Sequence, residues 1–478
     1  MFGNCFPNTL DTTVDFNMVD GRPDTYIITG DIDAMWLRDS TNQVWPYVSL
    51  AKDDPAIRDL IRGLMRRQAR CVLLDPYANA FYRTPDKVSQ WKSDHTAMKP
   101  GVHERKYELD SLASVLRLAA GYHEATGDAT PFDEQFRAAI RRIIQTIRDE
   151  QAGTPEQIHP HYNFQRNAAS ASDTLPLEGH GNPCRRTGMS RSPFRPSDDA
   201  CVFQYSIPAN AMAAINLQRI SDVLSGSGLD ADLAGDAQAL GQQIQRAVHI
   251  HGIVPHPRYG PIFAYEVDGF GSCSMMDDAG PPSLLALPYL GFSTRTHNIY
   301  RNTRQYVLSA ENPYFHAGAA GEGVGSPHIG LGWIWPLGII TRAMTAADDV
   351  EILNCLRTLK TTHAGKGFMH EAFWKDDASK YTRGWFAWAN TYFGELIVHL
   401  ARSRPDLLKR PLAYLETCLA GREFLVGSSF TVADLNAASI FMMAAGAKVD
   451  LAGYPQIRSW TERCFARPAF LRATAPRT

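Results

Sequence analysis

Helical periodicity constrains the fold of this chain more than any other feature of its sequence. Apolar residues recur at the spacing of one helical face within residues 57–64, 109–122 and 136–147, with charged residues between them. The pattern continues through most of the first 403 residues. The sequence therefore predicts an all-α fold for this part of the chain.

About twelve helices are expected by residue 403. They are predicted near residues 3–14, 36–51, 57–64, 109–122, 136–147, 207–224, 229–249, 281–289, 296–309, 331–345, 348–363 and 383–402. A regular run of paired helices favours a closed helical toroid, with a helical solenoid as the alternative.

Two long segments interrupt the helical pattern. Residues 75–106 and 152–206 are polar and rich in Pro, Gly, His, Arg and Asp. Long loops on a regular scaffold usually carry function. Residues 252–270 alternate between apolar and polar side chains, which predicts a β-hairpin.

The pattern changes after residue 403. Two prolines and several charged residues over 404–411 predict a linker. We therefore expect one large helical domain over 1–403 and a small separate helical segment over 412–470.

Composition excludes several classes of partner. Among 478 residues, Lys and Arg number 48 and Asp and Glu number 50, which gives a net charge of −2. This balance argues against a nucleic-acid partner or an anionic membrane, since both require a positive field, and it suits a neutral ligand such as a sugar. No apolar run approaches the roughly 20 residues of a membrane span.

The cysteines and the start of the chain predict a cytoplasmic protein. The eight cysteines are scattered and form no Cys-x-x-Cys pair, which indicates reduced thiols and neither a disulfide framework nor a zinc site. The first residues show no basic segment followed by an apolar run, so no signal peptide is expected.

Acidic, aromatic and arginine side chains are concentrated over residues 30–40, Gly-Asp-Ile-Asp-Ala-Met-Trp-Leu-Arg-Asp-Ser, at a predicted loop-to-helix junction. Aromatic faces stack on sugar rings, and Arg–Asp pairs hydrogen-bond vicinal hydroxyls. The structural alternative is a helix start that contains an Arg–Asp pair, because Asp favours the first turn. The residues alone leave both interpretations open.

A second cluster, Phe-Arg-Pro-Ser-Asp-Asp-Ala, covers residues 194–200 at the end of the second long loop. The adjacent carboxylates of Asp198 and Asp199 repel each other in a dry site, so the pKa of one is expected to rise. A general acid that works near neutral pH requires such a rise. The alternative is that Ser197 or an Asp caps the next helix.

The third cluster surrounds Glu371, which lies between His370 and a run of aromatic residues; a further aromatic run covers 383–388. This setting is typical of a base in an apolar pocket. The alternative is a partly exposed Glu beside core aromatics, and Trp385 and Trp388, three residues apart, fit core packing.

No His-Glu-x-x-His motif, calcium loop, dinucleotide fingerprint, P-loop or Gly-x-Ser-x-Gly motif occurs. We therefore expect neither a metal nor a cofactor. Two separated carboxylate sites are the minimal design of a glycosidase.

These clusters, in this order, resemble the motifs of glycoside hydrolase family 125, the metal-independent exo-α-1,6-mannosidases. The resemblance covers about residues 1–403. The matching stretches are Asn8–Thr13, Ile28–Asp31, Ala34–Ser40, Asp75–Phe81, Glu104–Glu108, Phe194–Ala200, Met276–Ala279, Gly325–His328 and Met369–Glu371. The resemblance implies an (α/α)6 barrel and inverting hydrolysis of terminal, non-reducing α-1,6-linked mannose from a mannose-containing glycan.

The resemblance also implies the roles of individual residues. Asp198 is the expected general acid, which protonates the leaving glycosidic oxygen, and Glu371 is the expected general base, which deprotonates the attacking water. Inversion predicts that their carboxyl groups lie roughly 6.5–9.5 Å apart. The residues expected to bind the terminal mannose are Arg38, Asp39, Glu108, Asp110 and His328.

Two features depart from the family pattern. The chain begins close to the first motif, so much of the family's first helix is expected to be missing. Residues 189–193, Met-Ser-Arg-Ser-Pro, stand where the family more often has a Trp and a Gly-containing turn. This change is expected to place a positive charge and a proline near the pocket.

The segment over 412–470 resembles the C-terminal helical half of a glutathione S-transferase, chiefly through residues 424–435. Thr431 is expected to cap a helix, with Asp434 returning the bond and Phe430 packing on Leu435. No βαβ unit of the kind that holds glutathione precedes this segment. We therefore expect no glutathione binding and no transferase activity.

Three functions remain open at this point. The first is the inverting exo-α-1,6-mannosidase. The second is a non-catalytic interaction protein with a damaged barrel, in which the transferase-like tail drives association. The third is an inverting glycosidase for another sugar or linkage. The presence of both Asp198 and Glu371 favours the first function.

Overall fold

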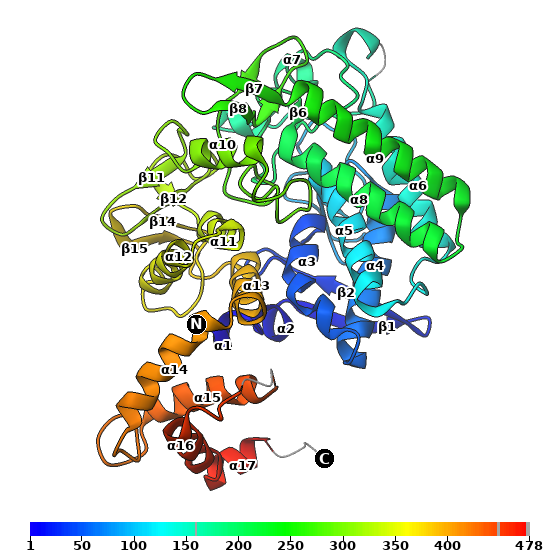
Figure 1. Ribbon diagram of the computed structural model, residues 1–478. Helices are drawn as coiled ribbons and strands as arrows, with labels where there is room; N and C mark the ends of the chain where they lie inside the picture. The colour runs from blue at the N-terminus through cyan, green and yellow to red at the C-terminus, as the bar shows by residue number, and fades with distance from the viewer. Residues whose placement is uncertain (158–159, 447–449, 475–478) are drawn as a thin grey trace. The chain divides into compact units, whose positions relative to one another are not determined.

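Helices dominate the structure (Figure 1). The computed structural model describes residues 1–157, 160–446 and 450–474. In chain order the α-helices are α1 (Phe2–Cys5), α2 (Asn8–Thr12), α3 (Leu37–Val44), α4 (Pro55–Leu74), α5 (Leu109–Thr126), α6 (Glu134–Asp149), α7 (Pro176–Gly179), α8 (Ile207–Gly226), α9 (Ala231–His251), α10 (Asn298–Val307), α11 (Pro336–Thr345), α12 (Asp349–Thr361), α13 (Ala387–Ser403), α14 (Asp406–Leu419), α15 (Val432–Gly446), α16 (Pro455–Phe465) and α17 (Pro468–Thr474). Short 3-10 helices are η1 (Trp45–Leu50), η2 (Thr154–Glu156) and η3 (Ala171–Asp173).

Short strands join the helices and pair in small antiparallel sheets. The strands are β1 (Val14–Val19), β2 (Arg22–Ile27), β3 (Met35–Trp36), β4 (Ala80–Phe81), β5 (Val102–Glu104), β6 (Tyr205–Ser206), β7 (Ile253–His256), β8 (Gly260–Phe263), β9 (Glu266–Val267), β10 (Cys273–Ser274), β11 (Phe315–Ala317), β12 (Glu322–Val324), β13 (Trp333–Ile334), β14 (Ala372–Trp374) and β15 (Asp377–Thr382). Their orders are β1-β2, β3-β4-β5, β10-β9-β6, β7-β8, β11-β12 and β13-β14-β15.

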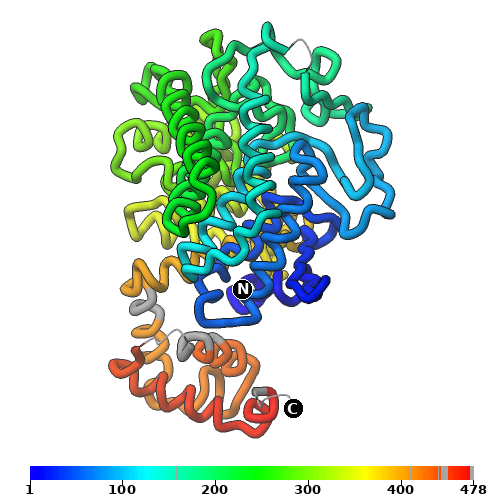
Figure 2. The backbone as a smooth tube through the Cα atoms, turned by 90° about the vertical axis from the view of Figure 1, so that its right-hand side faces the viewer, coloured from blue at the N-terminus to red at the C-terminus, as the bar shows by residue number. Residues whose placement is uncertain are grey.

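The chain forms two compact units, residues 3–396 and residues 397–478. In the first unit the longer helices pack against one another, with α8 against both α9 and α5, and α4 against α6. Helices α8 and α9, drawn in green, run side by side in Figure 1 and again in Figure 2. This unit therefore has the helix-rich architecture that the periodicity predicts.

Capping side chains and apolar stripes explain where these helices begin and which face they bury. The carboxylate of Asp133 accepts a hydrogen bond from the first-turn N–H of Phe136 at the start of α6. Phe136, Ile140 and Ile147 of the same helix are then buried, as the spacing within 136–147 predicts. Asp54, at the start of α4, caps in the same way.

Two predicted helices are wrong in detail. Residues 281–289 form turns and no helix, because three prolines bracket this short run and the Asp277 carboxylate accepts the N–H groups of Leu284 and Leu285. The helix predicted over 3–14 is divided at Pro7 into α1 and α2, and strand β1 follows. The hairpin predicted within 252–270 is confirmed as β7 and β8.

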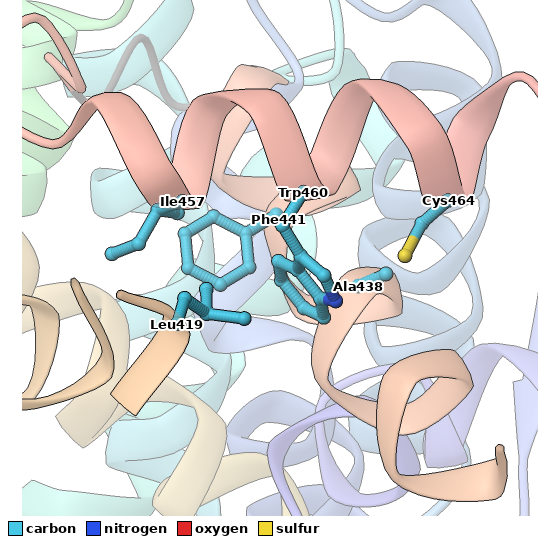
Figure 3. Close-up of a cluster of buried hydrophobic side chains, with 6 residues drawn as sticks. All are labelled: Leu419, Ala438, Phe441, Ile457, Trp460 and Cys464. Atoms are coloured by element: carbon cyan, nitrogen blue, oxygen red, sulfur yellow. The ribbon is translucent and has the colours of Figure 1, made fainter. Parts of the chain in front are cut away.

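The second unit has a core of its own. Six residues from α14, α15 and α16 are buried together, and Figure 3 shows Phe441 and Trp460 at the centre of this group. Its members are Leu419, Ala438, Phe441, Ile457, Trp460 and Cys464. Among the described residues, no helix of either unit is long and apolar enough to cross a membrane.

The capping box at the start of α15 is confirmed. Thr431 Oγ1 accepts the N–H of Ala433, and Asp434 Oδ2 accepts the N–H of Thr431 at 2.9 Å. Phe430 packs against the core of the second unit, whereas Leu435 is 54% exposed. The packing of Phe430 on Leu435 stays a prediction.

Asp434 also joins separate parts of the second unit, which yields a prediction. Its Oδ1 accepts the indole N–H of Trp460 at 2.9 Å and the N–H of Leu425 at 2.8 Å. Asp434→Ala leaves these buried donors without an acceptor, so we expect a loss of about 2–4 kcal/mol in this unit. Urea unfolding combined with limited proteolysis, mapped to residues 397–478, measures this loss. Thr431→Ala, which removes one cap, should cost only about 1 kcal/mol; equal losses would contradict the role of Asp434.

Candidate active site

The three sequence clusters meet at one pocket within the first unit. Each cluster contributes side chains to its wall. The polar and aromatic lining residues are Thr29, Trp36, Arg38, Asp39, Ser197, Asp198, His328, Trp335, Glu371, Arg383, Phe386 and Trp388. Segments as far apart in the sequence as Thr29 and Trp388 therefore converge on one cavity, which no local pattern predicts.

A small sheet fixes the first cluster. Strand β3 pairs with β4 and β4 with β5, and the N–H of Leu37 donates to the carbonyl of Asn79. Helix α3 begins directly after β3, so Arg38 and Asp39 occupy its first turn. The chain that follows β5 brings Glu108 and Asp110 beside them. A purely structural role at the helix start does not account for Arg38 and Asp39, because both residues also line the pocket.

Arg38 contacts four carboxyl groups. Its Nη1 lies 2.5 Å from Glu108 Oε2 and 3.4 Å from Asp110 Oδ2. Its Nη2 lies 3.3 Å from Asp39 Oδ2 and 3.5 Å from Asp198 Oδ1. The Arg38 side chain is only 4% exposed. One buried guanidinium therefore holds together residues from three parts of the sequence.

The excess of carboxyl groups perturbs their ionisation. Burial raises the pKa of Asp110 to about 6 and that of Glu108 well above its usual range, even though Arg38 acts in the opposite direction. Burial also raises the pKa of Asp39. Burial alone would lower the pKa of Arg38, but the surrounding carboxylates outweigh it and raise that pKa.

The second cluster forms a tight loop that presents Asp198. Phe194 and Ala200 form an antiparallel bridge, and the N–H of Arg195 donates to the carbonyl of Asp199 at 2.8 Å. Arg195 is anchored by a buried ion pair with Glu266 at 2.6 Å. Asp198 has a φ of +68° at the tip, a left-handed conformation that a non-glycine residue holds only when its surroundings impose it.

The expected rise of an acid pKa in this cluster is wrong for Asp198. Burial would raise its pKa, but the positive charges of Arg38 and Lys106 lower it below its usual range. Lys106 Nζ also donates to the backbone carbonyl of Asp198 at 2.8 Å. Neither Ser197 nor an Asp of this cluster caps the next helix, since Ser206 caps α8.

The residues beside Asp198 form a second polar group in the wall. Ser197 Oγ donates to Asp278 Oδ2 at 2.6 Å. His328 Nδ1 lies 3.7 Å from Asp199 Oδ1. Burial would lower the pKa of His328, but Asp199 and the more distant Asp198 raise it to about 9. His328 is therefore a cation at neutral pH.

The third cluster holds Glu371 at the start of a strand. Glu371 directly precedes β14, and it is 5% exposed, so the alternative of a partly exposed Glu does not hold. His370 stacks on Tyr381 with ring centroids 3.9 Å apart, and its Nδ1–H donates to the carbonyl of Arg383 at 2.9 Å. Arg383 Nε in turn lies 3.5 Å from Glu371 Oε1 and 3.4 Å from Asp31 Oδ2.

Four polar atoms of lining residues have no hydrogen-bond partner within the described parts of the chain. They are the indole Nε1 of Trp36, the indole Nε1 of Trp335, Nε of Arg38 and Oδ2 of Asp39, and the last of these keeps its ion-pair contact with Arg38. Buried polar groups normally have partners, so donors without partners in the wall of a pocket point to a hydroxyl-bearing ligand. Trp335 was not among the predicted site residues, and Arg383 was predicted only as part of the run at 383–388, without a role. Trp335 lies in the run Trp-Ile-Trp-Pro over 333–336.

The structure separates the predicted sugar-binding residues into two groups. Arg38, Asp39 and His328 line the pocket. Glu108 and Asp110 do not line it; their side chains are fully buried against Arg38. Trp388, which fits core packing by its spacing, lines the pocket and lies 5.7 Å from the Arg38 guanidinium.

The charge expected near the pocket from residues 189–193 is absent from its lining. Arg191 is buried, pairs with Glu150, and donates from Nη1 to Gln157 Oε1 at 2.9 Å. Within the described ranges 1–157, 160–446 and 450–474, no group of three or more His, Cys, Asp or Glu residues is placed to hold a metal ion.

The Arg38 cluster predicts a pH-dependent loss of stability. Arg38→Met leaves four carboxyl groups without their shared cation, at a cost of about 3–5 kcal/mol. Carboxyls whose pKa is raised by folding favour the folded state at low pH, and for Asp110 this stability is lost as the pH rises from 3.8 to about 6. The melting-temperature deficit of Arg38→Met should therefore be greatest above pH 6 and shrink towards pH 4. The surface variant Arg219→Met, which breaks a pair with Glu124, should show a small, pH-independent deficit; a pH-independent deficit for Arg38→Met as well would contradict the assignment.

Comparison with known proteins shows that each unit matches a known protein family. Residues 1–398 match the family model of metal-independent α-mannosidases, and residues 403–468 match the model of the glutathione S-transferase C-terminal domain. The Meiotically up-regulated gene 157 protein of Schizosaccharomyces pombe is 46% identical over 429 residues, which are 86% of this chain and 83% of that protein.

Solved structures agree with the family match. A Streptococcus pneumoniae metal-independent α-mannosidase, in a non-productive complex with α-1,6-mannobiose, superposes with a TM-score of 0.80 at 39% identity, over 84% of this chain and 93% of that one. A bacterial glucoamylase complexed with acarbose has a TM-score of 0.50 at 13% identity, over 76% of this chain and 48% of that one, and is similar in fold alone. The chain therefore belongs to glycoside hydrolase family 125, the metal-independent α-mannosidases.

Proposed function

We propose that this protein is an exo-acting α-1,6-mannosidase that inverts the anomeric configuration. The observation that carries the proposal is that Asp198 and Glu371 line one pocket together with Trp36 and Trp335, whose indole N–H groups have no hydrogen-bond partner among the described residues. Two carboxyl groups in a pocket that offers donors and acceptors to hydroxyls are what glycoside hydrolysis requires. The similar pneumococcal enzyme, solved with α-1,6-mannobiose, supports this linkage.

In the proposed reaction Asp198 protonates the glycosidic oxygen as its bond to C1 breaks. Glu371 takes a proton from a water whose oxygen bonds to C1 from the opposite face. Arg383, 3.5 Å from Glu371 Oε1, orients the Glu371 carboxylate. The products are free mannose of inverted configuration and the shortened glycan.

The other parts of the pocket are proposed to bind the terminal sugar. Asp39 Oδ2 accepts a mannose hydroxyl, and the indole N–H of Trp335 donates to another. Arg38 and His328 carry positive charge in the wall, where they bind hydroxyl oxygens. Glu108 and Asp110 contribute indirectly, because they hold Arg38 in place.

We also propose that the helices of the first unit close into an (α/α)6 barrel. The packing of α8 on α9 and of α11 on α12 supports this arrangement of paired helices. The second unit is proposed to be a separate helical domain that binds no glutathione and takes no part in the chemistry.

The function is tested by proton NMR of the protein acting on α-1,6-mannobiose with EDTA present. We expect β-mannose to appear first, which reports hydrolysis and inversion together, at a rate that EDTA leaves unchanged. Glu371→Gln should lower kcat by about a thousandfold without a change in melting temperature, because it removes only the base. Glu322→Gln, at an exposed position on β12, is the matched control and should retain wild-type turnover.

Other outcomes of this experiment identify the alternatives. Early α-mannose would contradict inversion. No product from folded protein on this substrate, but turnover of another mannoside, would contradict the α-1,6 linkage. A large fall in melting temperature of Glu371→Gln with unchanged turnover would mark Glu371 as structural and favour the non-catalytic interaction protein.

Trp335→Phe isolates the contribution of one donor. The change removes the indole N–H and keeps an aromatic ring in the wall, so we expect kcat/KM to fall roughly 5- to 30-fold, in line with about 1–2 kcal/mol for a buried hydrogen bond. Trp333→Phe is the matched control, because Trp333 packs edge-to-face on Trp374 and does not line the pocket. If both variants lose the same activity, Trp335 acts through packing and does not bind substrate.

A further inference from the structure

The acid loop (residues 194–200) has an uncommon backbone conformation at its tip. Asp198 has a φ of +68°, and a residue other than glycine keeps such a left-handed conformation only where its surroundings stabilise it. The N–H of Asp198 donates to the carbonyl of Arg195 at 2.9 Å, and the N–H of Arg195 donates to the carbonyl of Asp199 at 2.8 Å. These bonds close the turn, but the carbonyl of Asp198 is held by a contact from outside the loop.

Lys106 supplies this outside contact. Its Nζ donates to the carbonyl oxygen of Asp198 at 2.8 Å, and it lies 5.2 Å from the ring of Phe194, which begins the same loop. The Lys106 side chain is only 3% exposed. A buried ammonium group is costly unless it is bonded, so this bond is a fixed contact, unlike those of a lysine on the surface.

A ring of charged side chains holds Lys106 in place. Asp173 Oδ1 accepts a hydrogen bond from Lys106 Nζ, and Glu104 Oε1 lies 3.8 Å from the same nitrogen. Arg166 contacts both carboxyl groups, at 3.2 Å from Asp173 Oδ1 and 2.9 Å from Glu104 Oε1. Two cations and two carboxylates therefore form a closed ring of balanced charge, in which only Asp173 is partly exposed.

The 3-10 helix η3 connects this ring to the acid loop through the backbone. Asp173 and Ser172 both belong to η3, and the carbonyl of Ser172 accepts the N–H of Ala200 at 2.7 Å. The acid loop is therefore held at two points, at Asp198 by Lys106 and at Ala200 by η3. Because Asp173 also binds Lys106, the two points of attachment support each other.

We propose that Lys106, anchored by Asp173, is the positioning residue of the general acid: its bond to the carbonyl of Asp198 holds the tip of the acid loop so that the Asp198 carboxyl faces the pocket. Lys106 does not itself line the pocket, so it acts only through Asp198. The inference rests on the proposed function, in which Asp198 protonates the leaving oxygen.

The dependence of Lys106→Met on the leaving group tests the proposal. Methionine keeps a long side chain in the buried slot but removes the bond to the Asp198 carbonyl. A displaced acid slows a reaction that needs a proton on the leaving oxygen, so we expect kcat on α-1,6-mannobiose to fall about 30- to 100-fold. An aryl α-mannoside with an acidic phenol needs little of this proton and should lose less than about fivefold. KM should change less than about twofold, because no lining side chain is altered.

The selectivity of the loss separates positioning from other roles. Equal losses on the two substrates would mean that Lys106 supports the whole site, which would overturn the proposal. A cation beside Asp198 favours its ionised form, so a role through charge alone would give undiminished turnover of mannobiose and a basic limb at higher pH. That result would overturn the proposal as well.

Lys99→Met is the matched control. Lys99 Nζ also donates to a backbone carbonyl, that of Leu74 at 2.8 Å, and lies 3.7 Å from a carboxylate oxygen of Asp75. Neither Lys99 nor its two partners line the pocket. The variant should therefore keep wild-type turnover of both substrates.

Asp173→Ala decides the question if Lys106→Met fails to fold. The Asp173 side chain is 32% exposed, and Arg166 keeps its ion pairs with Asp94 and Glu104, so the change leaves a smaller buried deficit. Lys106 loses its anchor, and we expect turnover of mannobiose to fall about three- to tenfold while the aryl mannoside is unaffected. An equal loss on both substrates, or no loss on mannobiose, would overturn the proposal.

Hydrogen exchange of the acid loop separates this proposal from the proposed function. The N–H groups of Arg195, Asp198 and Ala200 are bonded to backbone carbonyls, so their exchange reports opening of the loop. Exchange over residues 194–201 should become at least about tenfold faster in Lys106→Met and stay unchanged in Lys99→Met, whether or not the protein hydrolyses mannobiose. Faster exchange with an inactive wild type would refute the mannosidase but keep the positioning role. Unchanged exchange would overturn that role even in an active enzyme.

Discussion

The buried guanidinium of Arg38 is the interaction on which the rest of the site depends. It contacts carboxyl groups from the start of α3, from the segment after β5 and from the loop at 194–200. A guanidinium keeps its charge even when buried, so its burial is costly unless carboxylates surround it, and the same cation offsets the repulsion among the carboxylates. The three segments therefore stabilise one another's positions, and the pocket forms where they meet. The same arrangement sets the ionisation of the acid, because Arg38 and Lys106 hold Asp198 ionised while Glu108 is driven towards its neutral form.

Helical periodicity predicted most of the first unit because each helix buries a single stripe and begins at a capping side chain, as α6 does at Asp133. It failed at 281–289, where an apolar run has the composition of a helix but its N–H groups bind the carboxylate of Asp277. The short strands were also largely beyond prediction. Strands of two or three residues such as β3 and β4 have no period to detect, and they exist only because distant segments pair.

The sequence predicted which clusters form the site, but not which of their side chains reach the cavity. The clusters at 30–40, 194–200 and 367–388 all reach the pocket, since each combines side chains that a sugar site needs. The sequence could not distinguish Asp39, which faces the cavity, from Glu108, which is buried behind Arg38. The expectation that the pKa of one of the two adjacent carboxyl groups rises does not hold for Asp198, whose pKa is lowered. Adjacency to Asp199 in the chain does not reveal Arg38, which is 160 positions away in sequence and contacts Asp198 in space.

The pocket belongs to the first unit, and the second unit has a core of its own. Every residue that lines the pocket lies between Thr29 and Trp388, within the first unit. The second unit has its own buried cluster around Trp460 and its own cap at Asp434, so its helices are held by contacts within it. The capping box and the bond from Trp460 to Asp434 are folding interactions, and none of them presents an unpaired polar group to a cavity. Among the residues that the structure describes, the side chains that line the pocket therefore all come from the first unit.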